Sequence, residues 1–171
     1  MGQGKNKSGF TIVELLIVVV VIAILAAITI VSYNGVTNRA NDSAVQQDLA
    51  TIAKKIQLSY TQKGVYPIGA GLGDIGIRVS KGSYSRGMYN GSSWYNMLYC
   101  WPDSVNQNRF ALIAQSKSGN VYQWVDGRLT QIGTEMKGSI PQCADAGVTI
   151  NGVSRDWFYD QDAWQVSIVG S

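Results

Sequence analysis

The sequence predicts an α+β fold: a long N-terminal α-helix packed on a small antiparallel β-sheet head. The first half of the helix is expected to span a membrane, and the second half is expected to be amphipathic. Three observations lead to this fold class. A long apolar run lies near the N-terminus, a helical hydrophobic stripe follows it, and short alternating segments separated by turns occupy the C-terminal half. The 171 residues suffice for one modest domain beside a membrane segment.

The apolar run begins after a short polar segment. Residues 1–9 read MGQGKNKSG, and the segment from Phe10 to Val31 carries a single charge, at Glu14. As a helix this segment would rise about 33 Å, which is enough to cross the hydrocarbon core of a bilayer. Lys5 and Lys7 should remain on the cytoplasmic side. We therefore expect a single-pass membrane protein with its C-terminal domain outside.

A secretory signal peptide would account less well for this segment. Its apolar stretch would be shorter and would end at a small-residue cleavage site. Ala26 and Ala27 are small, but the apolar run continues past them. A carboxylate inside an apolar segment is costly, and by default it has a function and a partner. Glu14 therefore argues against both a signal peptide and a simple anchor.

The run Gly9-Phe10-Thr11-Ile12-Val13-Glu14-Leu15-Leu16 resembles the processing and assembly motif of type IV pilins and type II secretion pseudopilins. The resemblance implies that prepilin peptidase, a membrane aspartyl peptidase, cuts between Gly9 and Phe10 and that Phe10 becomes N-methylated. It also implies that Phe10, Thr11 and Glu14 serve assembly, with the Glu14 carboxylate pairing with the N-terminal amine of a neighbouring subunit. Two charges that are each costly alone would then offset one another.

One feature departs from the family pattern. Where many members carry a proline that interrupts the helix, this chain has Val31. Valine keeps the helical hydrogen bonds that proline would remove. Local melting is therefore expected near Thr29 to Gly35, where Asn34-Gly35 is a breaker pair, or not at all.

Helical periodicity persists beyond the apolar run. One apolar stripe is expected to pack on the head, and its members are Val45, Leu49, Ile52, Ile56 and Tyr60. The opposite face carries Gln46, Gln47, Lys54 and Lys55, and we interpret the lysine pair as solvated rather than as a DNA-binding feature. Lys63-Gly64, followed by Pro67, should end the helix. The predicted organisation is a leader (1–9), an assembly helix (10–33), an amphipathic half-helix (34–64) and a head (65–171).

The head should contain a small antiparallel meander. Residues 68–93 are rich in glycine and serine and suggest a long loop. Strands are predicted at Arg109–Ser116, Val121–Val125 and Leu129–Ile132, with turns at Lys117–Asn120 and at Asp126-Gly127. One face of such a sheet can pack on the helix stripe while the other remains in water.

The two cysteines, Cys100 and Cys143, flank this meander. An even count in an exported region favours one disulfide, although two buried thiols are an alternative. A bridge would tie the C-terminal segment to the sheet and could stabilise the fold by about 4 kcal/mol on the chain-entropy model. Residues 148–153 suggest a short hairpin in that segment.

Other candidate sites are weaker. Asp156, Asp160 and Asp162 offer oxygen ligands at short spacing for calcium, but the spacing does not match an EF-hand loop and we expect no metal or cofactor. Aromatic residues could form a stacking platform for single-stranded DNA or sugars, but a core role is favoured for Tyr84, Tyr89, Trp94, Tyr95, Tyr99 and Trp101. The GxGxxG match at residues 71–76 lacks a strand–helix context and is interpreted as chance.

Charge and composition exclude further classes. Histidine is absent, which removes the commonest general base and every Ser-His or Cys-His arrangement. The formal net charge is +3, and without Lys5 and Lys7 the chain has 12 basic against 11 acidic side chains. No overall field therefore attracts nucleic acid, so a nucleic-acid partner remains uncertain. We expect a protein that is not an enzyme.

The functional prediction is a structural subunit, specifically a major pilin, of a type IV pilus serving adhesion, motility or DNA uptake. Its expected partners are further copies of itself, prepilin peptidase, the inner-membrane assembly platform and the membrane. It would occupy the inner membrane as a precursor and then an extracellular filament. The alternatives are a pseudopilin of type II secretion and a single-pass membrane-anchored binding domain that does not polymerise.

Overall fold

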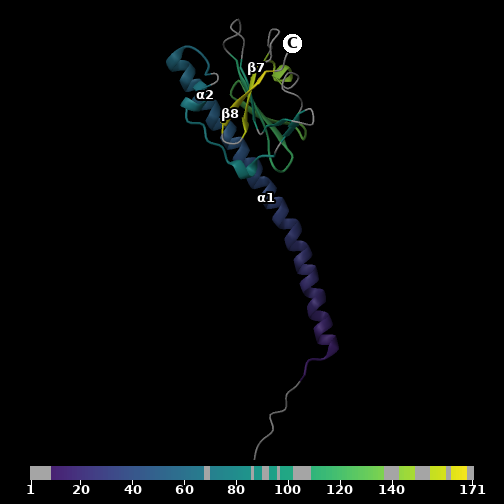
Figure 1. Cartoon of the computed structure of the whole chain (residues 1–171). Coiled ribbons are helices and arrows are strands. Elements are labelled where there is room, and N and C mark those ends of the chain that lie inside the picture. The colour runs from purple at the N-terminus through teal and green to yellow at the C-terminus, as the bar shows by residue number, and fades with distance from the viewer. Residues whose placement is uncertain are drawn as a thin grey trace, which may run out of the picture. The chain divides into compact units, whose positions relative to one another are not determined.

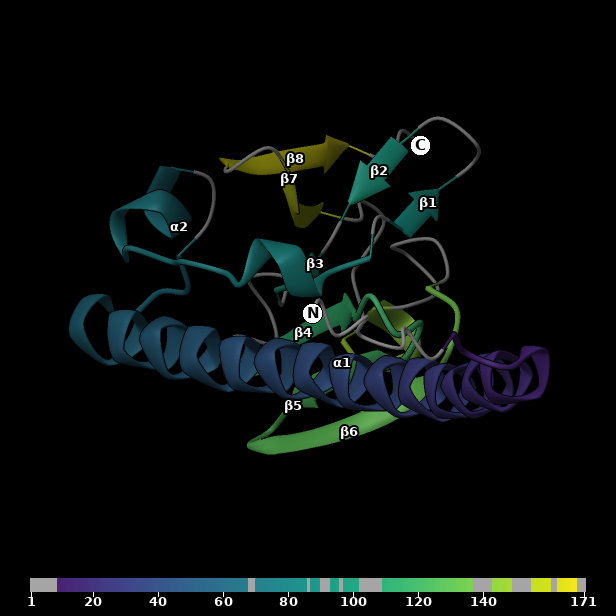
Figure 2. The same cartoon turned by 90° about the horizontal axis from the view of Figure 1, so that it is seen from below.

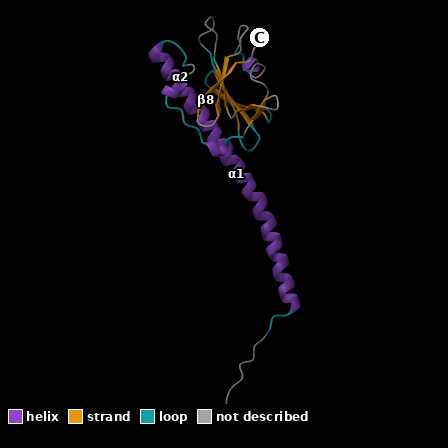
Figure 3. Ribbon diagram, in the orientation of Figure 1, coloured by secondary structure: helices purple, strands orange, loops and turns teal. Residues whose placement is uncertain are grey.

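The structure is a computed structural model, and it describes residues 9–67, 70–85, 87–89, 93–95, 97–101, 109–136, 143–148, 155–160 and 163–168. The chain divides into two compact units, Met1–Thr37 and Asn38–Ser171. The second unit combines helix and antiparallel sheet, as Figures 1 and 3 show, so the predicted α+β class is confirmed.

The helix α1 extends from Ile12 to Lys63 over 52 residues and crosses the boundary between the units. Gly64 follows it with a φ of 70°, the left-handed conformation that glycine adopts at little cost after a helix. The Gly64 N–H donates to the Tyr60 carbonyl at 2.8 Å, so the predicted end of the helix is confirmed. The backbone stays helical through Asn34-Gly35, without an interruption at the breaker pair.

The main sheet has six antiparallel strands in the order β6-β5-β4-β3-β7-β8. Its strands are β3 (Met97–Cys100), β4 (Ala111–Gln115), β5 (Val121–Val125), β6 (Arg128–Gly133), β7 (Arg155–Asp160) and β8 (Ala163–Ile168). A separate antiparallel pair is formed by β1 (Gly87–Tyr89) and β2 (Ser93–Tyr95). The three strands predicted from sequence correspond to β4, β5 and β6.

The predicted apolar stripe of α1 forms the principal core. Four of its members are buried, namely Val45, Leu49, Ile52 and Ile56, and Ala53 joins them. They pack in one cluster with Tyr99, Leu112 and Trp124 of the sheet, and we call this side of the sheet the helix face. Tyr60 is half-buried and stacks on Tyr66 with ring centroids 4.4 Å apart.

Half of the predicted aromatic set can be assigned to the core. Tyr84, Tyr99 and Trp101 are at most 9% exposed and belong to this cluster, so the core interpretation is confirmed for them. Tyr89, Trp94 and Tyr95 lie in β1 and β2, where only the backbone is described.

The opposite side of the sheet, here the outer face, is not left in water as we expected. It buries Leu98, Cys100, Ala111, Ile113 and Val121 against residues from outside the sheet: Met136, Cys143, Ala146 and Val148. The prediction failed because these covering residues lie outside the meander. Strands with both faces covered lose the alternation between apolar and polar residues.

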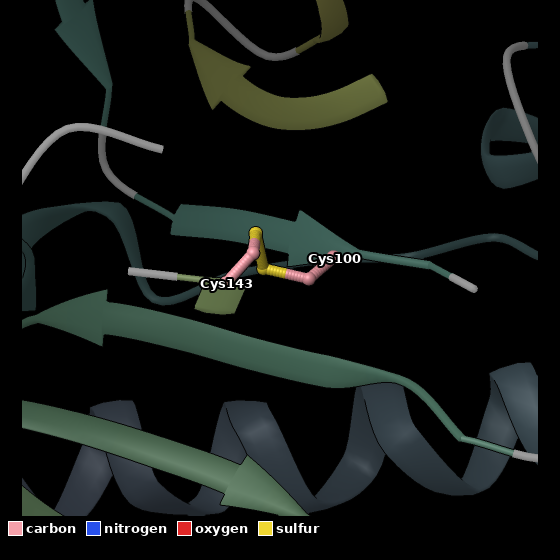
Figure 4. Close-up of a disulfide and its surroundings, with 2 residues drawn as sticks. All are labelled: Cys100 and Cys143. Carbon is pink, nitrogen blue, oxygen red and sulfur yellow. A yellow bond between two sulfur atoms is a disulfide. The ribbon is translucent and has the colours of Figure 1, made fainter. Parts of the chain in front are cut away.

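A disulfide between Cys100 and Cys143 holds part of this cover in place (Figure 4). It joins β3 to the segment 143–148 with a Cα–Cα distance of 5.6 Å, and both cysteines are fully buried. Arg109 supports the same segment, since it forms a 2.7 Å salt bridge with Asp126 and donates to the Gly147 carbonyl at 3.5 Å. A Cβ added at Gly147 would lie 3.1 Å from the Arg109 guanidinium, so this close approach suits glycine.

The segment predicted as a plain loop at residues 68–93 contains short elements. It holds the helix α2 (Ala70–Asp74), the 3-10 turn Lys81–Ser83 and the strand β1. Leu72 of α2 is fully buried in the principal core. The glycine and serine content concealed α2 because one buried residue, Leu72, rather than a periodic pattern, anchors it.

Polar side chains of α1 attach this segment to the helix. The Asp48 carboxylate accepts hydrogen bonds from the Ser80 N–H at 2.6 Å and from the Tyr84 hydroxyl at 3.0 Å. Lys55 is half-buried and donates an exposed hydrogen bond to the Gly76 carbonyl, which is a contact that the sequence did not predict. Lys54 is exposed as predicted.

Asp42 attaches the turn between β4 and β5 to the helix. Its carboxylate accepts hydrogen bonds from the Ser118 hydroxyl and, at 2.9 Å, from the Asn120 amide. Partial burial raises the pKa of Asp42, but hydrogen bonds from Ser118, Ser116, Asn120 and Tyr122 outweigh this effect and hold the pKa below its ordinary value.

This lowered pKa predicts a pH-dependent contribution to stability. The carboxylate should stabilise the fold above its unfolded-state pKa of about 3.9, and the contribution should be lost as the pH falls through the lower folded-state pKa. Thermal unfolding of the wild type and of Asp42→Asn should therefore differ most at neutral pH. The difference should narrow as the pH falls from about 5 to about 3. A difference that stays constant over this range would contradict the assignment.

Candidate processing and assembly site

The predicted cleavage position lies immediately before α1. Gly9 and Phe10 precede the helix, which begins at Ile12, and neither belongs to a regular element. The Phe10 side chain is 91% exposed. A Cβ built at Gly9 meets nothing within 4 Å, so the rest of the described chain leaves this peptide bond open.

Thr11 and Glu14 form a reciprocal cap at the start of the helix. The Glu14 carboxylate, through one oxygen (Oε2), accepts hydrogen bonds from the Thr11 N–H at 2.8 Å and from the Thr11 hydroxyl at 2.7 Å. In return the Glu14 N–H donates to Thr11 Oγ1 at 3.2 Å. This is a capping box, which satisfies backbone donors that a helix start otherwise leaves free.

Our interpretation of the sequence assigned Thr11 and Glu14 to assembly and missed this cap. The signal was present, because Thr-x-x-Glu directly before an apolar run is the sequence signature of a capping box. The cap uses one oxygen of the carboxylate, and no other hydrogen bond is recorded for the second oxygen within the described chain. The cap therefore determines where the helix begins, and the second carboxylate oxygen of Glu14 can still accept a hydrogen bond.

The first unit presents a long apolar helix surface whose described side chains are exposed. The large apolar side chains from Phe10 to Val36 whose exposure is described are between 48% and 91% exposed. Within the described residues, α1 is the one helix that is long and apolar enough to cross a membrane. Burying such a surface in lipid or against similar helices would be strongly favourable.

The weaker candidates receive no support. Asp156 and Asp160 lie in the strand β7, and Asp162 lies outside the described residues. Among the described residues, no three potential metal ligands come together. Most of the predicted hairpin at residues 148–153 also lies outside the described residues.

Comparison with known proteins agrees with this N-terminal site. Residues 4–30 match the family model of the prokaryotic N-terminal methylation motif. The chain is also 39% identical, over 74 residues, to the type IV wide pilus major component PilA4 of Thermus thermophilus. The chain is therefore similar to type IV pilins over these matched segments. That relative is, by its name, a structural component of a pilus.

The extent of these matches is limited. The alignment with PilA4 covers 40% of this chain and 56% of the relative, so the chain spans about half the length of that pilin. No solved structure gave a significant match. The family model matches residues 4–30 alone, and the head is described from its own structure.

Proposed function

We propose that this chain is a pilin, a major subunit of a type IV pilus that is made as a membrane-held precursor, cut between Gly9 and Phe10 and polymerised through α1. The exposed apolar surface of the first unit carries the proposal. A surface of this size requires lipid or another apolar partner, because water solvates it poorly. The methylation motif at residues 4–30 makes other copies of the same helix the appropriate partner.

The geometry at Gly9 supports processing by a separate enzyme. Glycine is required by a chain's own fold where φ is positive or where a neighbour would clash with a Cβ. Gly9 has neither property, since nothing lies within 4 Å of its built Cβ and it does not appear among the glycines with positive φ. A requirement for glycine at this position would therefore come from the prepilin peptidase that holds the scissile bond.

The Glu14 carboxylate supports assembly in register. After cleavage, Phe10 would carry a free amine, which becomes N-methylated in our proposal. An uncompensated charge is costly among packed apolar helices, whereas a carboxylate and an ammonium group offset one another there. The pair would therefore favour one axial position of each subunit relative to the next. Adhesion, motility and DNA uptake are roles that such a filament could serve.

N-terminal mass spectrometry of material sheared from the cell surface tests this proposal. We expect chains that begin at Phe10 and carry an N-methyl group. Recovery of only intact chains beginning at Met1, confined to the membrane, would overturn the filament and leave an anchored binding domain. Processed chains found solely in short envelope structures that depend on secretion genes would instead favour a pseudopilin.

A further inference from the structure

The six-stranded sheet ends in two strands of equal length. β6 and β8 each contain six residues, and among the described strands each pairs with a single strand, while α2 also contacts β8. Figure 2 shows the two strands on opposite sides of the sheet. An edge strand presents unpaired backbone N–H and C=O groups, and proteins commonly protect such edges with lysine or proline. β6 and β8 contain neither residue, and β8 carries no charge. All residues of β6 except the half-buried Leu129 are exposed.

The hairpin before β6 determines which backbone groups face outward. Asp126 and Gly127 have φ values of 49° and 81°, as in a type I′ turn, and they connect the opposed residues Val125 and Arg128. The residues that flank a two-residue turn exchange hydrogen bonds, and the pattern then alternates along the strand. Arg128 and Thr130 therefore bond to β5. The N–H and C=O groups of Leu129 and Gln131 point away from the sheet.

The register connects the two edges by a single row of residues. Thr130 at one edge and Gln165 at the other belong to the same row across all six strands: Thr130, Gln123, Ile113, Leu98, Phe158 and Gln165. Both ends of the row are uncharged and polar. If the sheet of a second copy continued the first sheet along this row, Gln165 of one copy would lie opposite Thr130 of the other.

Strand direction makes this joint an antiparallel one. All neighbouring strands in the sheet are antiparallel, so β6 and β8, the first and sixth in order, run in opposite directions. Copies with the same orientation would thus place β6 of one subunit antiparallel to β8 of the next. If the sheet had an odd number of strands, its two edge strands would run in the same direction, and copies with the same orientation would pair them in parallel. Two β6 edges, in contrast, could pair antiparallel only if one subunit were inverted.

We propose that β6 of one subunit pairs with β8 of a neighbouring copy, so that the sheets of adjacent heads join edge to edge. The inference depends on the proposed filament, in which all subunits have the same orientation. A β6–β8 contact joins two different surfaces and does not close on itself, as a fibre requires. Main-chain bonding would then add a lateral contact between heads to the contacts between apolar helices.

Disulfide trapping tests the joint directly in filaments of the full chain. In the proposed row, Thr130 and Gln165 of two copies form a non-hydrogen-bonded pair with a Cα–Cα distance of about 4.5 Å, which a disulfide can bridge. The variant with both Thr130→Cys and Gln165→Cys should give ladders of covalently joined subunits under mild oxidation. Each single variant, which retains the native Cys100–Cys143 bridge, should give no ladder. Intact filaments of the double variant without a ladder would overturn the proposal.

A matched pair of variants tests whether the edge backbone matters. Gln131→Pro removes a backbone N–H that faces outward, whereas Gln131→Ala keeps this N–H. Both variants lose the 2.9 Å hydrogen bond from the Gln131 side chain to Asn120. We expect Gln131→Pro to lower the yield of sheared filaments at least about ten-fold and Gln131→Ala by less than about two-fold. Equal yields would overturn the proposal.

Two controls separate the possible causes of failure. Formation of the Cys100–Cys143 bridge in each variant shows whether its head has folded. If Gln131→Pro lacks the bridge, the result of the cysteine trapping decides the question alone. Absence of filaments from the wild type would contradict the proposed function and not the β6–β8 joint specifically.

Discussion

Glu14→Gln should leave the precursor in the membrane but reduce surface filaments at least about ten-fold, because it removes the charge pair that we propose for the assembled state. Glutamine can still accept hydrogen bonds from Thr11, as it does in many capping boxes, so α1 should begin at the same residue. The substitution therefore separates the charge of Glu14 from its role in the cap. Quantifying pilin in sheared and membrane fractions measures the effect.

Thr11 provides the complementary test. Thr11→Ser retains the hydroxyl that bonds to Glu14, whereas Thr11→Ala removes the side-chain half of the cap and keeps the carboxylate charge. We expect Thr11→Ser to form filaments at close to the wild-type level. If Glu14→Gln assembled normally while Thr11→Ala did not, the function of the carboxylate would be to begin the helix, and charge pairing between subunits would be rejected.

Replacing both Cys100 and Cys143 by alanine should lower the free energy of unfolding by about 4 kcal/mol, the value expected for a closed loop of this size. The bridge joins residues 43 positions apart, and its loss frees the segment 143–148 that covers the outer face of the sheet. Alanine is preferred to serine because both cysteines are fully buried and a hydroxyl there would need a new partner. Urea unfolding of the full chain in detergent micelles provides the measurement.

Two further results follow if the bridge has this role. The wild type should retain its disulfide under mild reductant until the head unfolds, because both cysteines are inaccessible to solvent. The double variant should expose the outer face and bind a hydrophobic dye more strongly than the wild type. A change in the free energy of unfolding below about 1 kcal/mol would show that packing alone holds the segment in place.

Local patterns in the sequence were sufficient for the helical part of the fold. The spacing of Val45, Leu49, Ile52 and Ile56 predicted the buried stripe, and Gly64 predicted the end of α1. The strands β4, β5 and β6 were also recognisable, because they are consecutive and separated by short turns. In each case the residues that determine the element are neighbours in the chain, so short-range periodicity and turn chemistry carry the information.

The strands β3 and β7 illustrate what remained hidden. They pair across a separation of more than fifty residues, and β3 is buried along its whole length, so no alternation of apolar and polar residues marked it as a strand.

The residues that cover the outer face were missed for a related reason. Cys143 identified the segment 143–148 as tied to the sheet, but no local pattern showed which face Ala146 and Val148 would cover.

The sequence by itself determined the processing and assembly motif, the apolar helix and its amphipathic continuation, because each depends on residues within a few turns of one another. Only the tertiary structure decided that the sheet has six strands, that β3, β4 and β5 are covered on both faces and that Thr130 and Gln165 stand at opposite ends of one row. These features arise from pairing between distant segments. Distant pairing depends on the packing of the whole head, which local sequence patterns do not encode.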